Sequence, residues 1–377
     1  MKRVLFCLSD FKQGGIPRCL QSLLEQLDTS FVKADVLCLY QDGPYKGALK
    51  NCRVLPEDYV VSRLMVHTKK IGWRNIWKHL PALALKCWRT LILKLTRRDI
   101  LTERLHQLAS KCSGYDAVIA YAEGMPAQLV EQITCSRKFV WIHNDYSWEC
   151  ARSGASQTNF PVFEKVVCVS EAARQAWIAC YPHLEAKTET LYNIINEEHI
   201  RARAEDPLDD PDFCTAQFTL VSIGRVCAQK QFEVIPSIAA ELKKAGGSFH
   251  WYIIGGGPKN EEELVRSAIR KQDVQACVTL LGEKVNPYPY LKQADAFVLT
   301  SRYESYPTVI NEAAILQVPI VANDIPCVRE MLHEYDGIVV DIKHMAQSLT
   351  TLLNHNSLRG GGYPNNKYWM RISIMPP

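Results

Sequence analysis

The 377-residue sequence predicts an α/β protein made of two Rossmann-like domains, and two patterns support this fold class. Short runs rich in Val, Ile and Phe alternate with longer helical patterns, which is typical of parallel sheets with crossover helices. The alternation is interrupted at Arg203–Asp212, an acidic stretch with two prolines and no periodicity. We therefore expect an N-terminal domain at residues 1–204, a C-terminal domain at residues 205–358 and an irregular tail at residues 359–377.

The apolar runs predict strands in both domains, with helical patterns between them. In the N-terminal domain we expect strands at Arg3–Leu8, Asp35–Tyr40, Asp116–Tyr121, Lys138–His143 and Lys165–Ser170, and helices beginning near Ile16, Met125 and Glu171. In the C-terminal domain we expect strands at Thr219–Ile223, Phe249–Ile254, Val278–Leu281, Ala296–Thr300 and Pro319–Ala322, and helices at Phe232–Lys244, Glu261–Lys271 and Thr308–Leu316. Because ligands of such sheets lie beyond the carboxyl ends of the strands, the residues that follow each strand are the candidates for function.

Composition excludes several classes of protein. The chain is 47% hydrophobic and 22% charged, so it can bury a core and is not disordered. No run approaches the roughly 18 apolar residues of a transmembrane helix, and the run Val4–Leu8 is too short for the core of a signal peptide. The 14 cysteines contain no C-x-x-C pair, which favours reduced thiols in a cytoplasmic protein over a zinc site.

The net charge of +4 is unevenly distributed. The segment from Tyr59 to Arg98 has ten Lys or Arg residues and no Asp or Glu, and it includes a helical pattern with one apolar face. That face is formed by Trp77, Leu80, Ala84, Trp88, Leu91 and Leu95. A basic helix with Trp and Leu on one side is typical of contact with an anionic membrane, which we predict for residues 69–98. The alternative is a core-packed helix with a solvated basic face. Nucleic acid is not expected as a partner, because no aromatic–basic recognition motif accompanies the charge.

Three strand-end motifs suit a phosphorylated ligand. Gly14-Gly15 lies between the first strand and its helix, where backbone N–H groups can approach a phosphate, although such turns are often only structural. Gly224-Arg225 ends another strand and Lys230 follows, so two cations can neutralise a diphosphate; the alternative is a pair of solvated surface cations. The turn Gly255–Pro258 does not match the dinucleotide pattern G-x-G-x-x-G, and we interpret it as a tight turn that lines the cleft.

The most specific motif is the segment Ser301–Ala313, in which two carboxylates are seven residues apart. Glu304 is predicted on a loop, and Glu312 about two turns inside the helix that follows Pro307. The backbone N–H groups of Thr308 and Val309 at the start of that helix can hold a phosphate, while the two glutamates accept hydrogen bonds from sugar hydroxyls. A glutamate in mid-helix is more often part of a solvated face, but apolar neighbours favour a cleft-facing role for Glu312.

Together these motifs resemble the retaining glycosyltransferases of the GT-B fold, family 4. The resemblance rests on the order of the Gly-Gly turn, Gly-Arg-x4-Lys, Gly-Gly-Gly-Pro and Glu-x7-Glu, followed by Pro319–Ala322. It covers about residues 1–355 and is strongest from Thr219 to Leu332. It implies two Rossmann-like domains that face each other across a cleft.

The resemblance also implies roles for individual residues. Arg225 and Lys230 would hold the diphosphate of a nucleotide-sugar, with Gly224 beside them, and stabilise the leaving group; Glu304 would face the donor sugar and Glu312 would bind the ribose. The base would contact the backbone around Glu283 and Val285, and Gly15 would lie against the diphosphate. His143 matches the histidine near the donor sugar, although a simple strand-end histidine is the alternative. The residues implied to be catalytic are therefore Glu304, Arg225, Lys230 and His143.

The implied reaction transfers a sugar, with retention, from a nucleotide-sugar, which we expect to be a UDP-sugar. The expected acceptor is a lipid-linked or other saccharide, and the expected process is synthesis of a cell-surface polysaccharide or lipopolysaccharide at the inner face of the cytoplasmic membrane. No Asp-x-Asp motif occurs in a suitable position, so we expect no metal cofactor, with fixed cations stabilising the departing diphosphate instead. Two alternatives remain: a GT-B-fold nucleotide-sugar epimerase and a non-catalytic nucleotide-sugar-binding protein. The atypical C-terminal tail departs from the long final helix of related enzymes.

Overall fold

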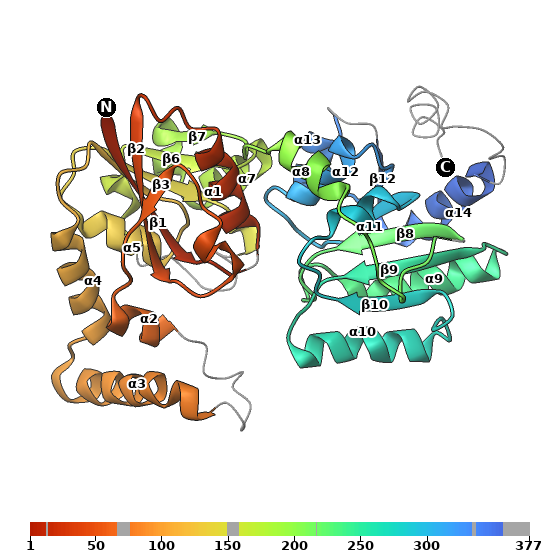
Figure 1. Ribbon diagram of the computed structural model, residues 1–377, viewed down its shortest axis with the longest axis horizontal. Coiled ribbons are helices and arrows are strands. Elements are labelled where there is room, and N and C mark those ends of the chain that lie inside the picture. The colour runs from red at the N-terminus through yellow and green to blue at the C-terminus, as the bar shows by residue number, and fades with distance from the viewer. Residues whose placement is uncertain (13, 66–75, 149–157, 216, 334–336, 357–377) are drawn as a thin grey trace. The chain divides into compact units, whose positions relative to one another are not determined.

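The computed structural model describes residues 1–12, 14–65, 76–148, 158–215, 217–333 and 337–356. The chain forms two compact units, and the second begins at Asn196 (Figure 1). The composition placed the boundary after residue 204, but α8 (Glu197–Ala204) packs against α11 (Tyr288–Lys292) and α12 (Thr308–Ile315) and so forms part of the second unit. The predicted tail, residues 359–377, lies outside the described residues.

The first unit contains a seven-stranded parallel sheet in the order β3-β2-β1-β4-β5-β6-β7. The predicted strands are present within a few residues, and the hydrophobic pattern missed β3 and β7, which have three residues each and lie at the two edges. The strands are β1 (Lys2–Asp10), β2 (Val32–Tyr40), β3 (Cys52–Val54), β4 (Ala117–Ala120), β5 (Lys138–Ile142), β6 (Lys165–Cys168) and β7 (Thr188–Thr190).

Both faces of this sheet are covered by helices, because side chains alternate along each strand. Phe6 and Leu8 of β1 pack with α1 (Gly15–Glu25) on one face. Leu5 and Cys7 belong to the core on the other face. The helices that contribute to this second core are α2 (Tyr59–Met65), α4 (Ile100–Lys111), α5 (Met125–Gln132) and α7 (Glu171–Cys180).

The second unit contains a six-stranded parallel sheet in the order β10-β9-β8-β11-β12-β13. Successive strands are added in one direction from β8 to β10 and in the other from β11 to β13. The order therefore reverses between β8 and β11, the position where ligands bind in sheets of this type. The strands are β8 (Phe218–Ile223), β9 (Phe249–Ile254), β10 (Val278–Gly282), β11 (Ala296–Leu299), β12 (Ile320–Asn323) and β13 (Ile338–Val340).

The core of the second unit is formed by strand side chains such as Trp251 and Ile253 together with α9 (Ile235–Lys244), α10 (Lys259–Lys271) and α14 (Met345–Asn356). The unit also contains α13 (Pro326–Met331). Short 3₁₀ turns occur in the chain at Pro44–Gly47, Phe160–Val162, Pro182–Lys187, Phe232–Val234 and Ile342–His344.

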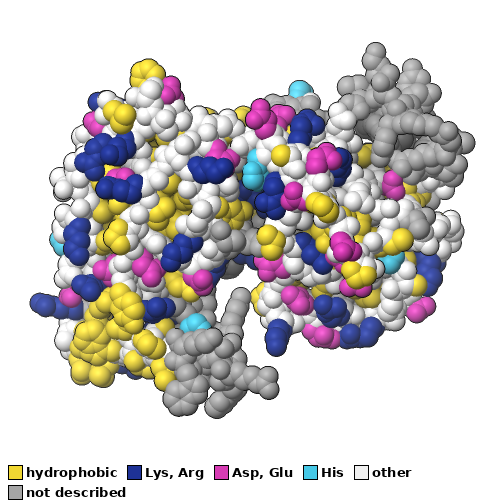
Figure 2. Space-filling view, viewed as in Figure 1, with side chains coloured by type: hydrophobic (Ala, Val, Ile, Leu, Met, Phe, Trp, Pro, Cys, Tyr) yellow, Lys and Arg dark blue, Asp and Glu magenta, His cyan; other side chains and the backbone are white. Residues whose placement is uncertain are grey.

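The predicted basic helix is α3 (Ile76–Thr96), which lies beside α2 and α4 at the edge of the first unit (Figure 1). Five members of its predicted apolar face are exposed: Leu80, Ala84, Trp88, Leu91 and Leu95. Figure 2 shows the resulting hydrophobic patch. Residues 69–75 of the predicted segment and the side chain of Trp77 are outside the described part. None of the described helices is long and apolar enough to cross a membrane.

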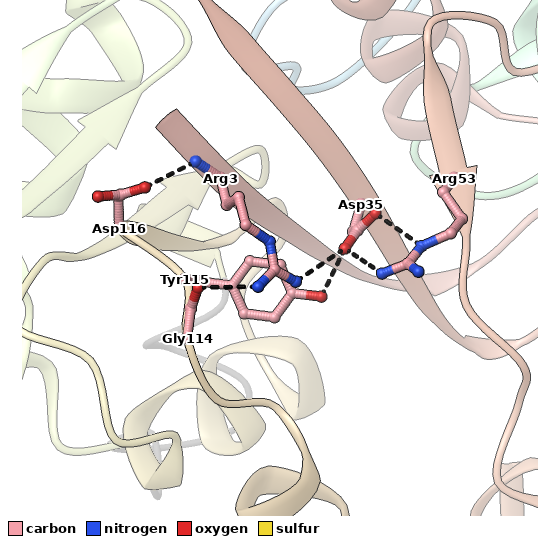
Figure 3. A network of polar contacts seen from close by, with 6 residues as sticks. All are labelled: Arg3, Asp35, Arg53, Gly114, Tyr115 and Asp116. Atoms are coloured by element: carbon pink, nitrogen blue, oxygen red, sulfur yellow. Dashed lines mark hydrogen bonds and ion pairs between the residues drawn. The ribbon is translucent and has the colours of Figure 1, made fainter. Parts of the chain in front are cut away.

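A polar network around Asp35 joins β1, β2, β3 and the segment before β4 (Figure 3). This buried carboxylate accepts hydrogen bonds from Arg53 Nε at 3.0 Å, Arg53 Nη2 at 2.7 Å and the Tyr115 hydroxyl at 2.7 Å. Arg3 Nη2 lies 3.7 Å away. Burial raises the pKa of Asp35, but these partners outweigh it and hold the pKa below its usual value. The network lies at the amino-terminal edge of this sheet, opposite to the carboxyl ends of the strands that precede Gly15 and His143.

Candidate functional site

In the second unit, the pairing of β8 with β11 brings two of the predicted motifs together. The strands are parallel, with Leu220 opposite Ala296 and Val221 opposite Phe297. The segment after β8 therefore lies beside the segment after β11, and Arg302 N donates to Gln229 O over 2.9 Å. The Thr300 hydroxyl donates to Lys230 O over 2.8 Å. These backbone contacts fix the loop that carries Lys230 against the loop that carries Glu304.

Lys230 and Glu304 form an ion pair at the centre of this site. Lys230 Nζ is 2.5 Å from Glu304 Oε1, and the two side chains are 15% and 9% exposed. The same oxygen accepts from the Ser301 hydroxyl at 2.8 Å, while Oε2 accepts from Gln229 Nε2 at 3.2 Å. These contacts fix Glu304, and the ion pair with Glu304 in turn holds the Lys230 charge in place, which suits stabilisation of an anion.

Two glycines allow this close arrangement of backbone and lysine. A Cβ atom on Gly224, which has a φ of 159°, would lie 3.0 Å from Lys230 Cε, so the lysine side chain runs across the bare backbone. A Cβ on Gly255, at a φ of 149°, would lie 1.8 Å from Gly224 O. The turn after β9 therefore packs directly on the end of β8, in agreement with its interpretation as a tight turn.

Arg225 is the second cation of the predicted pair. Its side chain is exposed and makes no hydrogen bond or ion pair with another described residue. Arg302, in the loop after β11, is instead bound to Glu233, with 2.7 Å between Nη2 and Oε1. The guanidinium group of Arg302 is thus already paired with a carboxylate, whereas that of Arg225 is free to bind an external anion.

The Glu-x7-Glu segment has the predicted local structure. Glu304 lies on the loop after β11, and α12 begins at Thr308, directly after Pro307. Glu312 is fully buried inside α12, and the Thr308 hydroxyl lies 3.4 Å from its Oε1 atom. Val309 is buried in the first turn. Glu312 therefore does not belong to a solvated helix face.

The segment predicted to contact the base follows β10 at the same edge of the sheet. Val285 is highly exposed, and the Glu283 side chain packs at the turn after β9, where a Cβ on Gly256 would lie 3.3 Å from Glu283 Cβ. Lys284 is held by Asp210, with 2.7 Å between Nζ and Oδ2. The predicted site residues of the second unit therefore all follow the carboxyl ends of its strands.

In the first unit, the predicted site residues also follow strand ends. Gly15 begins α1 after β1. Apart from chain neighbours and the backbone of α1, no described atom lies within 4 Å of where a Cβ on Gly14 or Gly15 would be. His143 follows β5 directly. Burial lowers the pKa of His143 to about 3, so its imidazole is neutral near pH 7. Its Nε2 atom is buried and has no hydrogen-bond partner among the described residues.

Three residues in these sites were not predicted from the sequence. Gln229 and Ser301 hydrogen-bond to Glu304, and both lie within or beside motifs that had been recognised. Glu123 follows β4 and hydrogen-bonds to the backbone at His143. It satisfies the same strand-end criterion that identified His143, and that criterion could have found it.

In its described parts the chain has no group of three or more His, Cys, Asp or Glu side chains placed to hold a metal ion. The candidate site of the second unit instead offers two cations, Arg225 and Lys230, together with hydrogen-bond donors. The absence of a metal requirement stays a prediction.

Comparison with known proteins makes the fold class more specific. The chain has a GT-B fold, with two α/β domains that each contain a parallel sheet. The HepE protein of Anabaena, crystallised with UDP and glucose, has a TM-score of 0.65 at 16% identity, with 95% of this chain and 90% of that chain covered. TarM of S. aureus has a TM-score of 0.68 at 14% identity, with coverage of 95% and 94%. At these identities the likeness shows the fold alone.

Sequence comparisons support a glycosyltransferase. Residues 217–355 match the family model described as glycosyl transferases group 1. The putative glycosyltransferase EpsF of Bacillus subtilis is 22% identical over 335 residues, which are 86% of this chain and 79% of that protein.

Two further relatives match over shorter lengths. One is the N-acetylgalactosamine-N,N'-diacetylbacillosaminyl-diphospho-undecaprenol 4-alpha-N-acetylgalactosaminyltransferase of Campylobacter jejuni, which is 28% identical over 178 residues, 46% of each chain. The other is the lipopolysaccharide core biosynthesis glycosyltransferase LpsD of Rhizobium meliloti, 28% identical over 144 residues, 37% of this chain and 40% of that protein. The chain spans less than half the length of these two relatives.

Proposed function

We propose that this protein transfers a sugar from a UDP-sugar to a lipid-linked saccharide during synthesis of a cell-surface polysaccharide or lipopolysaccharide. The observation that carries the proposal is the pair of cations at the β8/β11 switch point, where Lys230 is fixed by Glu304 and Arg225 is free. The donor and acceptor classes are supported by HepE, whose crystals contain UDP and glucose, and by the Campylobacter relative, whose name specifies a diphospho-undecaprenol substrate.

The proposed reaction retains the configuration of the sugar. The bond from C1 of the sugar to the β-phosphate oxygen breaks, and the diphosphate leaves with the electron pair. The acceptor hydroxyl bonds to C1 on the same face, and its proton passes to the departing phosphate oxygen. Lys230 and Arg225 stabilise the negative charge that develops on the diphosphate, so the step needs no metal ion.

The other site residues bind the two ends of the donor in this proposal. The N–H groups at the start of α12, at Thr308 and Val309, bind phosphate oxygens. Glu312 accepts hydrogen bonds from the ribose hydroxyls, and the backbone at Glu283–Val285 contacts the base. Glu304 bonds to the donor sugar while it holds Lys230. In the same proposal His143 contacts the donor sugar and Gly15 contacts the diphosphate.

The decisive experiment measures transfer by the purified chain from UDP-sugars to lipid-linked saccharides extracted from membranes, with and without EDTA. We expect a sugar-extended lipid product, unaffected by EDTA, and a fall of about 10²-fold or more in rate for Arg225→Ala. Arg302→Gln is the matched control, because it alters a nearby cation that is already bound to Glu233.

The results distinguish the proposal from its alternatives. UDP-sugar binding without consumption, even with acceptor present, would favour a non-catalytic binding protein. Conversion of free donor to another sugar without acceptor would favour an epimerase. A wild-type rate for Arg225→Ala would contradict the diphosphate role of the cation pair.

We further propose that the protein is cytoplasmic and contacts the anionic inner surface of the cytoplasmic membrane through α3. The support is that the Trp and Leu side of α3 is exposed, whereas the core-packed alternative requires it to be buried. Lys94, Arg97 and Arg98 are exposed near the C-terminal end of the same helix. A membrane-bound enzyme would meet a lipid-linked acceptor where the acceptor resides.

A further inference from the structure

Glu123 binds the backbone at the point where β5 ends. Its Oε2 atom accepts a hydrogen bond from His143 N, and its Oε1 atom accepts one from Asn144 N, each over 3.0 Å. Both amides lie beyond Ile142, the last residue of β5. A single carboxylate therefore replaces the strand ladder at this position and fixes two successive peptide units, including that of His143.

Glu123 is partly buried and lies close to the start of a helix. It lies on the loop between β4 and α5, two residues before α5 begins at Met125, so the positive end of the helix dipole is close. Burial raises the pKa of Glu123 above its usual value, and the hydrogen bonds from the amides of His143 and Asn144 offset this rise only in part. In its ionised form the carboxylate makes charge-assisted bonds, which are about twice as strong as neutral ones.

The same loop also holds the imidazole ring. Tyr121, two residues before Glu123, has its ring centroid 5.2 Å from that of His143. Tyr121 is itself buried and stacks on Trp141, with 5.6 Å between centroids. The loop thus fixes His143 twice, through the backbone by Glu123 and through the ring by Tyr121.

This double restraint coincides with a polar atom that has no partner within the described chain, Nε2 of His143. A neutral imidazole whose backbone and ring are both fixed is prepared to hydrogen-bond an external group. We propose that Glu123 is a positioning residue, which holds His143 in the orientation needed to contact the donor sugar. This inference rests on the proposed function, because that function places His143 beside the donor.

The test is a double-mutant cycle on the transfer reaction. We expect Glu123→Ala to lower kcat by about 10²-fold, the scale of a misplaced contact group, with the KM for the donor nearly unchanged. Glu123→Gln keeps one acceptor oxygen but turns an amide N–H toward the other backbone N–H. We therefore expect about a tenfold loss for it, between wild type and the alanine variant.

The cycle is completed with His143→Ala. If Glu123 acts through His143, the double variant is no slower than His143→Ala alone, because the histidine to be positioned is gone. The matched control is Glu131→Gln on α5, whose carboxylate also accepts one backbone N–H, from Asn159 at 3.1 Å. We expect the control to have wild-type kinetics.

A second measurement does not depend on turnover. Imidazole ¹H–¹⁵N spectra, with the His143 signal assigned by its loss in His143→Ala, should change in Glu123→Gln and stay unchanged in Glu131→Gln. Additive losses in the cycle, or an unaltered His143 signal, would overturn the positioning role. Absence of transfer by the wild type would contradict the proposed function instead, and the spectra would still decide the role of Glu123. If Glu123→Ala does not fold, Glu123→Gln supplies both readouts.

Discussion

The exposed side of α3 yields a quantitative prediction for membrane binding. Trp88, Leu91 and Leu95 are 51%, 53% and 72% exposed. Full burial of a leucine contributes about 2 kcal/mol, so the exposed fractions of the two leucines amount to about 2.5 kcal/mol. About half of an aromatic surface of roughly 200 Å² adds about 2.5 kcal/mol for Trp88. Transfer of the three side chains into a bilayer interface would therefore contribute up to about 5 kcal/mol.

The charges of α3 add a separate electrostatic contribution. Each cation near an anionic surface is worth about 1 kcal/mol, so Lys94, Arg97 and Arg98 together supply about 3 kcal/mol. Arg89 is left out of this set although it lies in the basic segment. Its Nε and Nη2 atoms bind the Asp99 carboxylate at 2.6 and 2.5 Å, and Asp99 caps the N-terminus of α4. Its substitution would disturb the attachment of α3 to α4.

The assay is co-sedimentation with phosphatidylglycerol–phosphatidylcholine vesicles. Replacing Trp88, Leu91 and Leu95 by Ser should weaken binding by about 10³-fold, since each 1.4 kcal/mol is a factor of ten. Replacing Lys94, Arg97 and Arg98 by Gln should weaken it by about 10²-fold. The charge-dependent part should be screened by salt, and the apolar part should persist.

Controls come from α10 of the second unit, a helix with a similar supply of exposed residues. Leu264→Ser removes an exposed leucine, and the combined change of Lys259, Arg266 and Lys271 to Gln removes three exposed cations. Neither should alter vesicle binding. Wild-type affinity of the α3 serine variant would refute the reasoning. A wild-type dimer in sedimentation that dissociates in this variant would show instead that the α3 face binds a second copy.

Two further predictions concern single carboxylates. Asp35→Asn should lower the free energy of unfolding by about 2 kcal/mol in urea titrations at pH 7, the scale of a hydrogen bond to a charged group. Because its folded pKa is depressed, the stabilisation by Asp35 is complete above the unfolded value near 3.9 and is lost as the pH falls through the folded pKa; melting curves of wild type and variant should therefore converge below pH 4, and parallel curves would contradict the network. Glu312→Gln should weaken UDP binding in calorimetry at least tenfold with little change in melting temperature, and unchanged affinity would remove its ribose role.

The sheets and the two motifs of the second unit were predictable because each is encoded by residues that are close together in the sequence. Gly224, Arg225 and Lys230 are close in sequence, and the lysine side chain crosses the bare backbone of the glycine. The interval from Glu304 to Glu312 likewise encodes a loop followed by a helix. The three-residue strands β3, β7 and β13 were missed because they are too short to show periodicity. The predicted domain boundary differs from the observed one because the sequence of α8 is polar and gives no sign of the unit to which the helix belongs. Its assignment to the second unit depends on packing against α11 and α12.

The environment of His143 was not predictable from pattern, because it depends on a contact across 20 residues of sequence. Hydrophobic alternation identifies where β4 and β5 end, but not which side chain reaches across to the next strand. The register of β4 with β5, in which Ala120 lies opposite Val140, brings the residues after both strands together. The register of these strands thus places two polar residues that follow different strands, Glu123 and His143, next to each other. The same reasoning applies to β8 and β11, where pairing unites Lys230 with Glu304. Polar residues that follow paired parallel strands are therefore better considered as pairs than one by one, and on that criterion Glu123 belongs to the candidate site as much as His143 does.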